Sequence, residues 1–207
     1  MEEKNYTGIV PQHHEGKIID TEASKTFDTT EEASKFFEAV KEKLVHVNRW
    51  HEVAGALSAT FQLVDSGGSE VDRAVQQGDY FKIDIPGPGT RSGEGYDWVT
   101  VEEVKEVNEG AVQSLGIRVR PTGNPHNTET DVAHFYSPSS TSNFIVTREG
   151  QTVTVSVYDR NTKPNDRTGN AVDTIRDKIV GATAVSFFSK IQWKKLVDGL
   201  LAEKDTK

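Results

Sequence analysis

The chain has 207 residues, of which 34% are hydrophobic and 27% are charged, and its formal net charge is −8. This length favours one domain, or at most two small ones, with a core large enough to need no metal or disulfide for stability. Because the chain contains no cysteine, disulfides, thiol nucleophiles and cysteine-based zinc sites are excluded. The acidic balance argues against nucleic-acid binding, which requires a basic surface.

The N-terminal region carries no targeting pattern. It lacks the basic and apolar regions of a signal peptide, and no apolar run in the chain approaches the ~18 residues of a membrane span. We therefore expect a cytoplasmic protein without a membrane span. Residues 1–16 show little periodicity and predict an N-terminal arm, followed by a single domain over residues 17–207. Lys17 to Phe27 predicts a first strand.

Two helices are expected after this strand. Thr29 with Glu32 three residues later matches a capping box, in which each side chain binds the backbone amide of the other. Apolar residues then recur at spacings of three and four, which predicts a helix from about residue 30 to the mid-40s. A short second helix is expected over Val47–Ala54, ended by Gly55.

The hydrophobic period then changes to two, which is typical of strands with one buried face. Turn residues separate the segments, and the short connections favour an antiparallel sheet. Strands are expected at Ala59–Leu63, Phe81–Ile85, Asp97–Val104, Leu115–Val119, Val132–Tyr136, Asn143–Thr147 and Val153–Val157.

The chain closes with a long helical pattern from about Asn170 to Lys204. A broad apolar stripe follows one side of this segment, so we expect the helix to pack across the whole domain. Gly181 lies in its middle and indicates a kink or a close approach of another backbone.

The order of these elements resembles the helix-grip fold of the START/Bet v 1-like superfamily, also called the SRPBCC or polyketide cyclase-like group. The segments that carry the resemblance are the helix with Phe36 and Phe37, the segment Asn48-Arg49-Trp50, and the closing helix with Gln192-Trp193-Lys194-Lys195-Leu196-Val197. The resemblance covers residues 17–204 and rests on element order, because the superfamily has no short signature.

The resemblance implies an α+β fold, in which a curved antiparallel sheet of about six or seven strands grips a long C-terminal helix. Two short helices would follow the first strand. It also implies a cavity between the sheet and the helix that takes a small apolar molecule. The N-terminal arm and the long loops at 86–95 and 121–130 depart from the superfamily pattern.

Several short patterns lack residues that the sites they resemble would need. The glycine-rich run Gly87–Gly95 lacks the lysine of a phosphate loop and precedes a strand instead of a helix. His14-Glu15 and His51-Glu52 each lack the second histidine, one helical turn later, that a zinc site would need. We therefore expect no metal and no cofactor.

Aromatic residues in the second half of the sheet are the candidates for ligand contact. Tyr96, Trp98, His134 and Tyr136 are the expected ligand-binding residues, although a role in the core explains these aromatic positions at least as well. His134 is also a candidate general base, because a histidine near a carboxylate in a dry pocket can move a proton.

Three functions stay open at this point. The first is a carrier or sensor that binds a small apolar or aromatic ligand between the sheet and the C-terminal helix. The second is a protein-interaction module with a filled core. The third, a cyclase- or isomerase-like enzyme acting through His134, is favoured least, so a non-enzymatic role is expected. The expected partner is a small apolar or aromatic molecule, with a homodimer as an open alternative and no nucleic acid.

Overall fold

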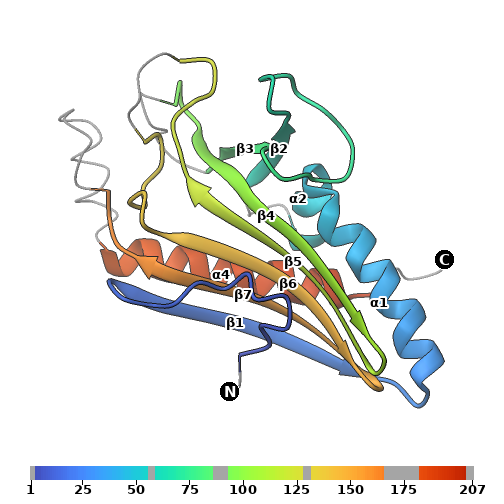
Figure 1. Ribbon diagram of the computed structural model, residues 1–207. Coiled ribbons are helices and arrows are strands. Elements are labelled where there is room, and N and C mark those ends of the chain that lie inside the picture. Colours follow the sequence, from blue (N-terminus) through green and yellow to red (C-terminus); the bar gives the residue numbers. More distant parts are fainter. Residues whose placement is uncertain (1–2, 56–58, 86–92, 128–131, 166–181, 204–207) are drawn as a thin grey trace.

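The structure is a computed structural model that describes residues 3–55, 59–85, 93–127, 132–165 and 182–203. In this part of the chain, one antiparallel sheet of seven strands has the order β1-β7-β6-β5-β4-β3-β2. Its first and last strands in the sequence are therefore neighbours, and the other strands follow as consecutive hairpins (Figure 1). The strands are β1 (Lys17–Thr26), β2 (Thr60–Val64), β3 (Tyr80–Asp84), β4 (Asp97–Glu109), β5 (Val112–Pro121), β6 (Thr141–Glu149) and β7 (Thr152–Thr162).

Helices pack on one face of this twisted sheet, which we call its inner face. α1 (Thr30–Val45) is followed by a single turn, η1 (Val47–Arg49), and by α2 (Trp50–Ala54), while α4 (Ala182–Leu201) closes the described chain. Figure 1 shows α4 running along the sheet behind β7 and β1, with α1 at the far end. The prediction of an α+β helix-grip architecture is confirmed in element order, in strand direction and in the position of the closing helix.

The start of α1 is determined locally, as the sequence predicts. The Thr29 hydroxyl accepts a hydrogen bond from the Glu32 amide, and the Glu32 carboxylate accepts one from the Thr29 amide, both at 3.2 Å. The short second helix ends at Ala54, where Gly55 adopts a φ of 87° that favours glycine. Of the long C-terminal helix, the described part begins at Ala182, so Gly181 and the expected kink lie outside the described residues.

The strand expected over Val132–Tyr136 is wrong. This segment bends, and only Tyr136 makes an isolated bridge. The cause is a local bond: Nδ1 of His134 accepts a hydrogen bond from the Tyr136 amide at 2.9 Å. A backbone amide bonded to a nearby side chain is no longer available to a strand ladder.

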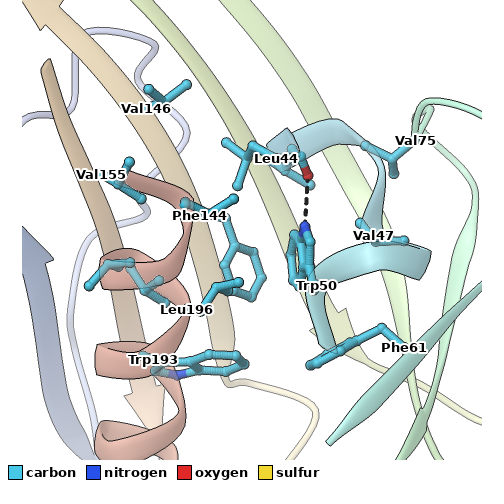
Figure 2. Close-up of a cluster of buried hydrophobic side chains, with 14 of the residues drawn as sticks. Leu44, Val47, Trp50, Phe61, Val75, Phe144, Val146, Val155, Trp193 and Leu196 are labelled. Atoms are coloured by element: carbon cyan, nitrogen blue, oxygen red, sulfur yellow. Dashed lines mark hydrogen bonds between the residues drawn. The ribbon is translucent and has the colours of Figure 1, made fainter. Parts of the chain in front are cut away.

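Aromatic residues fill the centre of the inner core. The Trp50 ring lies 4.7 Å from Phe144, 5.2 Å from Phe61 and 5.8 Å from Phe81, measured between centroids. Its indole nitrogen donates to the Leu44 carbonyl at 3.0 Å, so this buried polar atom is satisfied (Figure 2). These contacts join the two short helices to three strands, and much of the space between sheet and helices is thereby occupied.

The N-terminal arm crosses the opposite, outer face of the sheet (Figure 1). Ile9 and Val10 are buried there against Ile145 and Tyr158. Gly116 in β5 permits this approach, because a Cβ at that position would lie only 2.4 Å from the Ile9 side chain. No helix among the described residues is long and apolar enough to cross a membrane.

Candidate functional site

A cavity lies between the inner face of the sheet and α4. The cavity has a volume of about 40 Å³, and all the empty space at this place, including space that is open to solvent, amounts to about 470 Å³. Most of its lining is apolar and comes from β2 to β6, α4 and the segment 134–136. The lining residues are Phe61, Phe81, Ile83, Ile85, Val99, Val119, His134, Phe135, Tyr136, Ser142, Phe144, Gln192 and Trp193.

Few polar groups reach this cavity. Gln192 of α4 is buried, and its side-chain oxygen accepts a hydrogen bond from the Ala59 amide at 3.3 Å. Ser142 lies on β6, directly opposite Asp159 of β7. A small set of oriented polar groups in an apolar wall is the usual composition of a small-molecule pocket.

Three consecutive aromatic side chains form one wall. His134 stacks on Phe135 with 4.3 Å between ring centroids, and Phe135 lies 4.5 Å from Tyr136. Asn165, which follows β7, holds the segment from behind: its side-chain nitrogen donates to the carbonyls of Val132 and His134 at 3.1 Å. The bend that ends regular pairing therefore presents adjacent rings to one cavity.

The tautomer of His134 follows from the same bend. Because Nδ1 accepts the Tyr136 amide, the proton of the neutral ring is assigned to Nε2. Nε2 is then a hydrogen-bond donor. This geometry favours a donor role for His134 over the general-base role considered from the sequence.

Asp159 is a candidate functional residue that the sequence analysis missed. It lies on β7 with none of its surface exposed, and one carboxyl oxygen, Oδ2, accepts a hydrogen bond from the Trp193 indole at 2.9 Å. The other oxygen, Oδ1, has no hydrogen-bond partner among the residues that the structure describes. Both neighbours of this carboxyl, Ser142 and Trp193, line the cavity, so Asp159 lies directly behind its wall.

Burial controls the ionisation of this carboxyl. Loss of hydration raises the pKa of Asp159 to about 7, against the opposing effects of Ser142, Trp193 and Arg160, which favour the charged form. Arg160 gives little compensation because its guanidinium binds Asp20 and Glu3 instead. A carboxylic acid that changes its charge near neutral pH can exchange protons under ordinary conditions.

The other expected ligand residues lie elsewhere. Trp98 is adjacent to the inward-facing Val99 on β4, so its side chain emerges on the outer face. It packs there with Val64 and Ala133, and Tyr96 lies against the same cluster. The structure therefore brings His134 and Tyr136 to the cavity and leaves Tyr96 and Trp98 on the opposite side of the sheet.

No metal centre is evident in the part of the chain that the structure describes. No group of three or more histidine, aspartate or glutamate side chains is arranged there to hold a metal ion.

No protein-family model matches the chain, and no curated protein matches its sequence. Among solved structures, a hypothetical protein of Helicobacter pylori is 12% identical, with a TM-score of 0.46; the alignment covers 90% of this chain and 87% of that one. Norcoclaurine synthase from Thalictrum flavum is 9% identical, with a TM-score of 0.39 and coverages of 91% and 95%. Ara h 8.0201 is 13% identical, with a TM-score of 0.31 and coverages of 87% and 99%. At these levels of similarity, the argument for function rests on the site itself.

Proposed function

We propose that the protein binds a small molecule with an apolar or aromatic body in the cavity between the sheet and α4. The observation that supports this best is the cavity itself, which combines an apolar lining with a few oriented polar groups. His134 and Tyr136 are the proposed contact residues, together with Gln192 and Ser142.

The dimensions of the cavity restrict the ligand. A cavity volume of about 40 Å³ is much smaller than the ~150 Å³ cavity that accommodates benzene. We therefore expect a ring to lie where the cavity opens to solvent, and only a small substituent to enter the cavity itself. The His134 donor favours a substituent with an acceptor oxygen, such as a phenol, carbonyl or carboxylate.

A cavity-filling variant tests this function. Val119→Phe places a ring in the space that the ligand substituent would use, whereas Val112→Phe makes the same change at the other end of β5, away from the cavity. We screen phenols, indoles, flavonoid-like aromatics and short fatty acids by thermal shift and calorimetry. A ligand that binds the native state stabilises it by ~2.7 kcal/mol at one hundred times its dissociation constant.

The expected result is at least one ligand that stabilises the wild type and Val112→Phe but not Val119→Phe. If no compound stabilises the folded wild type, or if Val119→Phe binds as well as Val112→Phe, the proposal is wrong. The fold of each variant is checked by its cooperative unfolding in the absence of ligand.

A second candidate function, acid–base catalysis in the same cavity, is supported by Asp159. Its buried carboxyl has one oxygen without a partner and a pKa near 7. The test is hydrogen–deuterium exchange at the carbon atoms of a bound ligand, followed by NMR. If Asp159 is catalytic, the wild type exchanges hydrogen at the ligand, and Asp159→Asn abolishes this exchange while binding persists. If exchange in the wild type equals the uncatalysed rate, the catalytic function is excluded and only binding remains.

A further inference from the structure

The two edges of the sheet are treated differently. At the β2 edge, the chain covers its own strand: the Leu63 amide donates to the Asn48 side chain at 2.6 Å, and the Val71 amide donates to the Leu63 carbonyl at 3.0 Å. β1 forms the other edge and pairs only with β7 in the described chain. An uncovered edge strand offers a row of backbone donors and acceptors to another extended chain.

A groove follows this open edge, between β1 and α4. It has a volume of about 570 Å³ and is lined by residues 20–22 of β1 and by Lys190, Ile191, Lys194 and Lys195 of α4. This is larger than the central cavity and reaches the size range of ligand sites. The groove lies beside the position that a strand added to β1 would occupy.

Apolar side chains are exposed on both sides of this position. Ile18 of β1 is 52% exposed and Ile191 of α4 is 42% exposed, and Tyr6 is the one other large hydrophobic residue this exposed in the described chain. A strand added to β1 would lie between these two isoleucines, because Ile18 belongs to the strand and Ile191 to the helix beneath it. Its side chains would point alternately toward Ile18 on the outer face and toward α4 on the inner face.

The α4 side of the groove is basic. Asp20 binds Arg160, and Glu22 accepts a hydrogen bond from the Tyr158 hydroxyl, so both acids of β1 are engaged toward the outer face. On α4, Lys194 pairs with Asp198. Lys190 and Lys195 have no ion-pair partner among the described residues, and they lie along the groove.

We propose that this groove docks an extended, acidic segment of a partner protein, which adds to the free edge of β1 as an eighth strand. Backbone hydrogen bonds to β1 supply the part of the affinity that does not depend on the side chains of the added strand, as in other cases of strand addition. Acidic side chains on the inner face of the added strand meet the α4 lysines, and apolar ones on its outer face cover Ile18. This inference does not depend on the central cavity.

The probe is a fluorescein-labelled octapeptide of alternating valine and glutamate. The control peptide has the same length and label and alternates valine and lysine. Binding is measured by fluorescence anisotropy up to millimolar peptide at low salt. We expect saturable binding of the acidic peptide alone, with the affinity falling at least tenfold in the double variant Lys190→Glu/Lys195→Glu. The control variant Lys35→Glu makes one such charge reversal at an exposed position of α1, and it should change affinity by less than twofold.

Hydrogen exchange identifies the mode of binding. If the acidic peptide adds as a strand, it must protect from exchange the β1 amides that point away from β7. A peptide that binds the groove in another way would leave these amides unprotected. Absence of binding at millimolar peptide, or binding without protection in β1, overturns the proposal. Self-association of the wild type that Ile18→Asp abolishes would also overturn it, because a second copy would then occupy the edge. Binding to phosphatidylserine vesicles in place of the peptide would overturn it as well.

Discussion

The indole nitrogen of Trp193 donates a hydrogen bond to Oδ2 of Asp159 at 2.9 Å, and this bond joins α4 to β7 in a buried environment. The pair is unusual because the acceptor is a carboxyl group with a raised pKa, whose second oxygen has no partner. Trp193 is also part of the cavity wall and lies 5.1 Å from Phe144 between ring centroids. The ionisation of one aspartate is thereby connected to the position of a wall residue.

The first prediction concerns the pH dependence of stability. The unfolded carboxyl has a pKa near ~3.9, and burial raises that of folded Asp159 to about 7, so between these values the native state binds the extra proton. Its free energy of unfolding must therefore fall as the pH rises from about 4 to 7, by up to ~1.4 kcal/mol per unit. Urea unfolding of the wild type and Asp159→Asn at several pH values should show this slope in their difference. A pH-independent difference would contradict it.

Trp193→Phe should make this pH dependence steeper at its upper end. The substitution keeps an aromatic ring but removes the indole N–H that donates to Oδ2 of Asp159. The charged form loses its donor, so the pKa of Asp159 rises further and the loss of stability extends to higher pH. Unfolding measured from pH 6 to 9 checks this shift. In the Asp159→Asn background, Trp193→Phe should have no such pH-dependent effect.

The capping box of α1 gives a local prediction. Thr29→Ala removes the acceptor of the Glu32 amide and should lower the free energy of unfolding by about 1 kcal/mol. Thr29→Ser keeps the hydroxyl and serves as the control, with a loss below about 0.5 kcal/mol. Equal losses in the two variants, measured by urea unfolding, would show that the hydroxyl contributes nothing.

Gly116 and Ile9 allow a test of the docked N-terminal arm. Gly116→Ala introduces a Cβ that would meet the Ile9 side chain at 2.4 Å, so this side chain, or the arm that carries it, must shift. We expect faster limited proteolysis within residues 3–16 in this variant. Ile9→Ala in the same background removes the collision, and the double variant should be cleaved more slowly than Gly116→Ala alone if the steric contact is the cause.

The position of Trp98 predicts which aromatic residue matters for ligand binding. Trp98→Phe changes the outer face of β4 and should leave the affinity of a cavity ligand within twofold of the wild type. His134→Phe keeps a ring in the wall but removes the Nε2 donor, so affinity for an oxygen-bearing ligand should fall about tenfold, the loss of ~1.4 kcal/mol expected for one hydrogen bond. Calorimetry with both variants distinguishes the two faces, and the reverse order of effects would contradict this assignment.

How far the sequence predicts the structure depends on whether the deciding contacts are local. Thr29 and Glu32 are three residues apart, and their capping box is visible in the sequence because it depends on little else. The bend at 134–136 has an apolar pattern that resembles a strand, and the competing bond from the Tyr136 amide to His134 cannot be read from periodicity. Element order, by contrast, was sufficient to predict the fold class.

The site was less predictable because its residues meet through the tertiary structure. Asp159 follows the expected strand Val153–Val157, and nothing in its neighbours indicates that β7 continues to Thr162 and carries it beneath α4. Trp98 lies on one face of its strand and Val99 and Val101 on the other, so the apolar pattern does not say which of the two faces is the core. The alternating run Thr152–Tyr158 contains no acidic residue, and Asp159 follows it directly. A single acid that continues such a run is the signal that could identify Asp159.

The pairing of β1 with β7 also has a consequence for synthesis. Ser24 and Thr154 face each other across these strands although 130 residues separate them in the chain. At ~5–20 residues per second, the ribosome needs roughly 7–26 s to make the partner after β1 has been translated. During that interval the first strand lacks its partner β7, and the slow, long-range closure of the sheet must come late in folding. A nascent chain of this protein therefore depends on delayed collapse, or on a chaperone, more than its size alone would suggest.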